Sequence, residues 1–144
     1  MDKYDCLKLD NQLCFPLYAC SREIVRQYTP YLEPLGLTYT QYITLMALWE
    51  HRMLSVKDMG KLLHLDSGTL TPVLKKLEEK GLVNRRRSRE DERSLIVSLT
   101  EKGEALREQA VEIPAKVAGG LRLPQEDVQA LYQLLNKMLS TYSA

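Results

Sequence analysis

The sequence predicts a mainly α-helical fold that contains one small β-hairpin. Apolar side chains recur with helical spacing over most of the 144 residues. Between residues 82 and 99 the apolar side chains recur at every second residue, as in β-strands. Two such short runs flank a charged loop. Residues that cap helices stand before several apolar stretches, and Gly or Pro follows them. We therefore expect helices on both sides of a two-stranded hairpin.

The first helix is constrained by Pro16, which interrupts an apolar stripe over residues 9–28. A proline in a helix interior removes a backbone hydrogen bond and costs about 3 kcal/mol. The helix therefore either begins near Phe15, with Pro16 in its first turn, or kinks at Pro16. A break is expected over residues 29–38, which contain two prolines and a glycine.

Capping residues predict the next three helices. Thr38 and Gln41 have the spacing of a capping box, which opens a helix that extends to about His51. Ser55 opens a short helix, and after a tight turn another helix follows. Gly81 ends it, because glycine adopts the left-handed conformation at low cost.

The second half of the chain begins with the hairpin and ends with two helices. The strands are expected over residues 82–86 and 94–99, with a flexible charged loop between them. Thr100 caps a helix over about 101–118, bent at Pro114. After Gly119 and Gly120, a last helix runs from Pro124 to about Thr141.

A helix-turn-helix followed directly by a basic hairpin is typical of a winged helix. We expect one domain over residues 1–144, with a winged helix-turn-helix lobe at about 38–99. The flanking segments, about 5–36 and 100–144, have apolar faces too long for so small a core. They are expected to be dimerisation helices that pack against a second copy.

Composition excludes several classes of protein. Apolar residues make up 44% and charged residues 27%, as in ordinary globular proteins. No apolar run is long enough to span a membrane, and the polar N-terminus does not resemble a secretion signal, so a cytoplasmic location is expected. Cys6, Cys14 and Cys20 are then expected to be reduced. They and the two histidines lack metal-ligand spacing, so no metal or cofactor is expected.

The start of the second helix of the helix-turn-helix fits the DNA major groove. Small hydroxyl residues let the backbone approach, and they can bond to base edges. The lysines that follow would contact phosphates and set affinity rather than sequence preference. The expected DNA-binding residues of this helix are Ser67, Thr69, Thr71, Pro72, Lys75 and Lys76.

The hairpin carries most of the clustered positive charge. Arg85 and Arg86 lie on its first strand, and Arg93 could enter a minor groove from the loop. Asp91 is acidic in this basic loop, and its expected role is to orient Arg93 through a charge-assisted pair. A charged hairpin tip is more often merely solvated, but its place after a helix-turn-helix favours DNA contact.

These motifs resemble the MarR family of dimeric winged-helix repressors. The resemblance rests on LDSGTLTPVLKKLEEKGLVNR, DERS and SLTEKGE, and it covers nearly the whole chain. LDNQLCFPLY, LTYTQY and LWEH further resemble the organic hydroperoxide-sensing (OhrR-like), one-cysteine branch and the related thiol-based global regulators. The resemblance implies a homodimer on a pseudo-palindromic DNA operator. It also implies that Cys14 matches the peroxide-reactive cysteine, with Tyr28 and Tyr39 as its hydrogen-bonding tyrosines.

Cys14 has two interpretations. A cysteine on an apolar helix is more often an inert core residue. Against this, Pro16 places Cys14 near a helix N-terminus, where the helix dipole favours a thiolate, and Tyr18 lies one turn further on. Cys14 and Tyr28 would be about 21 Å apart along one helix, so a contact would need the other subunit.

The predicted mechanism is release of DNA after a hydroperoxide oxidises Cys14 and a thiol condenses with the product. A small-molecule thiol is preferred over Cys6, while Cys20 lies on another face of the helix. One alternative is a repressor induced by a small aromatic ligand, held by Tyr18, Tyr28, Tyr39, Tyr42 and Trp49. Others are a thiol peroxidase, a regulator that senses different oxidants, and a protein-interaction module.

Overall fold

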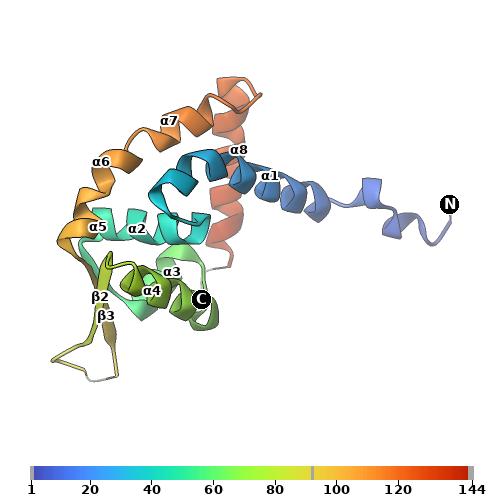
Figure 1. Cartoon of the computed structure of the whole chain (residues 1–144). Coiled ribbons are helices and arrows are strands. Elements are labelled where there is room, and N and C mark those ends of the chain that lie inside the picture. The colour runs from blue at the N-terminus through green and yellow to red at the C-terminus, as the bar shows by residue number, and fades with distance from the viewer. Residues whose placement is uncertain (1, 92, 143–144) are drawn as a thin grey trace.

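The computed structural model describes residues 2–91 and 93–142, which form a mainly helical protein with one small sheet (Figure 1). The N-terminal arm, residues 2–12, contains two short 3-10 helices, Asp5–Leu7 and Leu9–Asn11. The remaining elements are α1 Cys14–Leu32, α2 Tyr39–His51, β1 Met53–Ser55, α3 Val56–Leu63, α4 Ser67–Glu79, β2 Val83–Arg87, β3 Leu95–Leu99, α5 Glu101–Ala105, α6 Arg107–Ala110, α7 Ile113–Ala118 and α8 Gln125–Ser140.

Helix α1 begins at Cys14, so Pro16 is its third residue. The first turn of a helix has no intrahelical partner for its N–H groups, and a proline is tolerated there. The expected start near Phe15 is thereby confirmed. The expected break over residues 29–38 is present, but it begins after Leu32 rather than at Pro30, and a 3-10 turn then leads to Gly36. Gly36 has φ of +70°, which ends the turn.

The predicted caps are confirmed. The Gln41 backbone N–H donates to Thr38 Oγ1 at 3.3 Å, and the Thr38 N–H donates to Gln41 Oε1 at 3.2 Å. Ser55 caps α3 through the N–H of Asp58 at 3.0 Å. Thr100 likewise accepts from the Gly103 N–H at 3.0 Å. Each cap satisfies a donor that the helix itself cannot pair.

The predicted hairpin is present, with β2 paired antiparallel to β3. Its register places Val83 opposite Leu99 and Arg87 opposite Leu95. Within the described residues a third strand, β1, pairs with the other edge of β3 and was not predicted. Strand β1 has only three residues, and the last of them, Ser55, also caps α3. Its length and its pattern of apolar and polar residues therefore did not distinguish it from a loop.

The predicted helix over 101–118 is divided into α5, α6 and α7. The breaks fall at Leu106 and at Val111–Glu112, not at Pro114. Pro114 has no N–H to donate to a carbonyl of the preceding turn. A new helix, α7, therefore begins with the proline in its first turn. The last helix follows the prediction, with Pro124 preceding α8 and Thr141 ending it.

The core lies where α2, α4 and the sheet meet. Its most buried side chains include Leu45, Leu48, Leu70, Leu74, Leu77, Val83 and Val97. This packing fixes one face of α4 and leaves the opposite face exposed. In contrast, α8 has no buried residue, and the N-terminal arm extends away from the body (Figure 1). No helix within the described residues has the length and apolar character needed to cross a bilayer.

Candidate functional site

Cys14 is the first residue of α1, and its side chain is exposed. Because α1 is unbroken between Cys14 and Tyr28, the two residues are about 21 Å apart along the helix axis. The structure therefore does not bring them together within one chain. Cys20 is also exposed, about 1.7 turns further along α1.

Three tyrosines form a cluster where α1 crosses α2. The ring centroids of Tyr28 and Tyr39 are 4.9 Å apart with an edge-on arrangement, and those of Tyr28 and Tyr42 are 5.6 Å apart. Burial raises the pKa of all three phenols, that of Tyr42 to about 12, with further increases at Tyr39 and Tyr42 from neighbouring phenols. The hydroxyls are thus held as protonated donors.

Tyr18 does not join this cluster. Its hydroxyl accepts a hydrogen bond from Arg22 Nη1 at 3.3 Å, and the guanidinium lies 5.6 Å from its ring centroid. Both side chains belong to the exposed face of α1. The expected tyrosine pair, Tyr28 and Tyr39, is therefore brought together by the fold, whereas Tyr18 is held separately.

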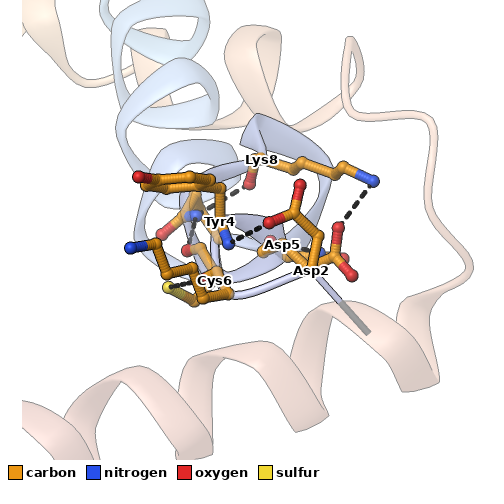
Figure 2. A network of polar contacts seen from close by, with 8 residues as sticks. Asp2, Tyr4, Asp5, Cys6 and Lys8 are labelled. Carbon is orange, nitrogen blue, oxygen red and sulfur yellow. Dashed lines mark hydrogen bonds and ion pairs between the residues drawn. The ribbon is translucent and has the colours of Figure 1, made fainter.

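Cys6 is held by contacts within the arm (Figure 2). Its thiol donates to the Lys3 carbonyl at 3.4 Å, and the side-chain amide of Gln12 donates to the Cys6 carbonyl at 2.8 Å. An ion pair between Lys8 and Asp5, 2.8 Å long, closes the same turn. The contacts of the Cys6 thiol are thus with its own turn rather than with α1.

The predicted DNA-binding residues of α4 lie on its exposed face. Asp66 caps the helix by accepting from the Thr69 N–H at 2.7 Å, and this hydrogen bond lowers the pKa of the Asp66 carboxyl. The opposite face carries the buried leucines of the core. The exposed residues are Ser67, Thr69, Thr71, Pro72, Lys75 and Lys76.

In the hairpin, Arg86, Asp91 and Arg93 are exposed. The Asp91 carboxylate accepts from the backbone N–H of Arg93 at 3.0 Å. The contact found is therefore with the backbone rather than with the guanidinium. Asp91 shapes the loop from which Arg93 projects.

Arg85 is half-buried and engaged inside the protein. Its guanidinium lies 3.1 Å from the carboxylate of Glu78, and its backbone N–H donates to the same carboxylate at 3.2 Å. The hydrogen bond from Arg85 lowers the pKa of Glu78. Sequence reasoning missed this pair, because the two residues belong to different elements. Arg85 thus fastens β2 to the end of α4.

Within residues 2–91 and 93–142, no group of three or more His, Cys, Asp or Glu side chains is placed to hold a metal ion. The candidate site thus has three parts. They are an exposed cysteine at the start of a helix, a tyrosine cluster elsewhere in the same chain, and an exposed polar helix beside a basic hairpin.

Comparisons with known proteins agree with this geometry. Residues 26–109 match the profile of the SarA/Rot transcriptional regulators. The chain is 53% identical over 140 residues to the organic hydroperoxide resistance transcriptional regulator of Bacillus subtilis, covering 97% of this chain and 95% of the relative. It is 45% identical over 132 residues to the transcriptional regulator SarZ of Staphylococcus epidermidis, covering 92% and 89%.

Among solved structures, reduced AbfR bound to DNA superposes with a TM-score of 0.78 and 36% identity, covering 97% of this chain and 98% of that one. AbfR is a protein of Staphylococcus epidermidis. The matched profile and both relatives are transcriptional regulators, so the thiol peroxidase alternative is not supported. The chain belongs to the MarR/SarA-type winged-helix transcriptional regulators, in the branch that contains the organic hydroperoxide resistance regulator.

Proposed function

We propose that this chain is a redox-sensing, DNA-binding repressor of the cytoplasm that leaves its operator when an organic hydroperoxide oxidises Cys14. The observation that carries the proposal is the placement of Cys14, exposed at the start of α1 and about 21 Å along that helix from Tyr28. In a homodimer with antiparallel first helices, Cys14 of one subunit meets Tyr28 and Tyr39 of the other. The sensor then lies in the subunit interface.

The chemistry needs two steps. The Cys14 thiolate attacks the peroxide, the O–O bond breaks, an alcohol leaves and a sulfenic acid forms. A small-molecule thiol then attacks that sulfur, an S–S bond forms and water leaves. The added group displaces the tyrosine hydroxyls. The spacing of the two α4 helices then departs from the roughly 34–36 Å that successive major grooves require.

DNA recognition is assigned to α4 and the hairpin. The N-terminal half of α4, with its exposed hydroxyl residues, enters the major groove, and Lys75 and Lys76 contact phosphates. Arg86 and Arg93 act from the hairpin, while Asp91 holds the loop and Arg85 sets the position of β2. The winged helix-turn-helix lobe covers about 38–99, and the segments at about 5–36 and 100–144 form the dimer.

Induction by a small aromatic ligand is not favoured. The rings of Tyr28, Tyr39 and Tyr42 pack against one another, with centroids 4.9 to 6.2 Å apart. Trp49 donates its indole N–H to the Gly103 carbonyl at 2.9 Å. These side chains fill space between elements rather than line a common ligand cavity.

The test compares wild type with Cys14→Ser. A DNA duplex is first selected from a random library by the reduced protein, and binding is then titrated with cumene hydroperoxide in the presence of a small thiol. Wild type is expected to lose affinity at least about tenfold, while Cys14→Ser holds the DNA. Cys6→Ser and Cys20→Ser are the matched controls and should respond as wild type does. Release of DNA by Cys14→Ser would contradict the proposal.

Mass spectrometry of the oxidised wild type identifies the thiol partner. The proposal expects the mass of one small thiol added to Cys14. A Cys6–Cys14 disulfide without added mass would contradict the assignment of the small thiol while leaving Cys14 as the sensor.

A further inference from the structure

The end of α4 is joined to the start of α2 by one side chain. Lys80 follows directly after α4, and its ammonium donates to Gln41 Oε1 at 2.7 Å and to the Gly36 carbonyl. Within the described residues Lys80 makes no ion pair, so these oxygens take the place of a carboxylate. Partial burial, and to a lesser extent Lys76, lowers the pKa of Lys80.

Gln41 connects this contact to the tyrosine cluster. The same Oε1 atom also accepts from the Thr38 backbone N–H at 3.2 Å, so it belongs to the capping box of α2. Gln41 lies between Tyr39 and Tyr42 in the first two turns of α2, and its side chain is buried. Because Tyr39 and Gln41 share the first turn of α2, a shift of that turn moves both Tyr39 and the acceptor of the Lys80 ammonium.

The other side of Lys80 is held by α5. The Lys102 ammonium donates to the Lys80 carbonyl at 3.0 Å. A cavity of about 420 Å³ opens beside this junction, lined in part by Leu35, Leu82 and Leu106. Leu77 and Leu82, which are buried, pack this end of α4 against the core on one side. On the side of Lys80, hydrogen bonds, which are directional, add to that packing in setting the position of the helix end.

We propose that Lys80 is the positioning residue through which the tyrosine cluster sets the orientation of α4. The inference rests on the proposed function, since it concerns how oxidation at Cys14 reaches the DNA-binding helix. Lys80 acts through Gln41 and Gly36 and does not itself contact the DNA. Coupling between two sites commonly changes affinity by about 5- to 150-fold. The connection through Lys80 would have to change the affinity for DNA within that range.

The test measures operator affinity of the reduced and the oxidised protein for Lys80→Met, Lys80→Arg and wild type. Lys57→Met is the matched control, because Lys57 is exposed on α3 and lies outside the segments assigned to the dimer and the residues assigned to DNA contact. In Lys80→Met the ratio of oxidised to reduced Kd is expected to fall at least about fivefold. Lys80→Arg, which keeps N–H donors at this position, should restore most of the ratio, and Lys57→Met should leave it unchanged. A ratio within twofold of wild type in Lys80→Met would overturn the inference.

The salt dependence of reduced-state binding separates positioning from a phosphate contact. Loss of a phosphate contact reduces the slope of log K against log salt by about one, whereas a positioning residue leaves the slope unchanged. A reduced slope in Lys80→Met would overturn the inference. If wild type itself keeps its DNA on oxidation, the proposed function fails. The role of Lys80 is then judged on the reduced protein alone. If Lys80 positions α4, Lys80→Met weakens DNA binding by the reduced protein without changing its salt slope. If Lys80→Met binds DNA as wild type does, that role is rejected.

Discussion

Tyr42 illustrates how a single residue can belong to the core and also contact the proposed sensor tyrosines. It is 2% exposed, and its ring packs against those of Tyr28 and Tyr39, with centroids 5.6 Å and 6.2 Å away. It lies on the buried face of α2. Its contact with the two predicted sensor tyrosines was not predicted, because it depends on the crossing of α1 over α2 rather than on spacing within either helix.

The raised pKa of Tyr42, about 12, predicts a pH dependence of stability. The unfolded chain releases this proton near pH 10, so the folded state binds more protons above that pH. The contribution is complete below about pH 10 and is lost as pH rises toward 12, with a limit of about 3 kcal/mol. Urea denaturation at pH 8, 10 and 11 should show a steeper loss of unfolding free energy in wild type than in Tyr42→Phe. Tyr4→Phe, in the exposed arm, is the control. Equal slopes in wild type and Tyr42→Phe would contradict the prediction.

Local contacts could be predicted from the sequence, and contacts between elements could not. Thr38 with Gln41 and Thr100 with Gly103 are three residues apart, so their spacing alone identifies them as caps. Glu78 with Arg85, and Lys80 with Gln41, are brought together by the fold. Neither pair has a local pattern. The residue types of the candidate site could therefore be predicted from the sequence, but the contacts within it could not.

At the scale of elements, the start of α5 lies against the backbone that leads into the hairpin. The two segments come closest at Gly103 and Leu82. A Cβ atom added there would lie 2.1 Å from the Leu82 carbonyl oxygen, which is far inside a normal contact. The same residue accepts the indole N–H of Trp49. Glycine at this position lets α5 begin directly against the first residue of the hairpin region.

Gly103→Ala is expected to lower the free energy of unfolding by roughly 2–3 kcal/mol, because either α5 or the backbone at Leu82 must move. Urea denaturation measures this directly. Gly120→Ala is a suitable comparison, since its added Cβ would meet nothing closer than 3.4 Å, and it should change stability by about 0.5 kcal/mol or less. If both variants were equally stable, the close approach would not constrain the fold.

The element boundaries that were missed have a common cause. Pro30 and Pro114 were both taken as points where a helix breaks or bends. Yet α1 accommodates Pro30 near its end, and the helix before Pro114 ends at Ala110. The end of α1 is instead closed by local bonds, from the Leu37 N–H to the Leu32 carbonyl and from the Gly36 N–H to the Glu33 carbonyl. Strand β1 likewise forms because it pairs with the edge of β3. The sequence of its three residues alone does not indicate that pairing.

At the scale of the whole molecule, the folded chain leaves several large apolar side chains exposed. On α8, Leu131 is 41% and Leu134 is 64% exposed, and no residue of the helix is buried. In the arm and at the start of α1, Leu7, Leu13 and Phe15 are also exposed. Patches of this kind mark interfaces between proteins. They agree with the dimerisation segments proposed at the two ends of the chain.

We expect the wild-type protein to sediment as a homodimer of twice 16.6 kDa at micromolar concentration. Leu131 and Met138 lie two turns apart on one face of α8, together with Val128 and Leu135. Placing a glutamate at both Leu131 and Met138 would bury charge in the interface and should raise the dimer Kd by at least about 100-fold. Gln133→Glu, on another face, adds a charge without entering that stripe and should remain dimeric.

The same variant tests how the dimer serves the function. A monomer presents a single α4 to the DNA, so operator affinity should fall together with dimerisation, and oxidation of Cys14 should then change the remaining affinity little. Sedimentation velocity and DNA titration on one preparation measure both properties. If the double glutamate variant were monomeric but still released DNA on oxidation, the sensor would have to act within one chain. The separation of about 21 Å between Cys14 and Tyr28 along α1 would then exclude the proposed tyrosine contact as the trigger.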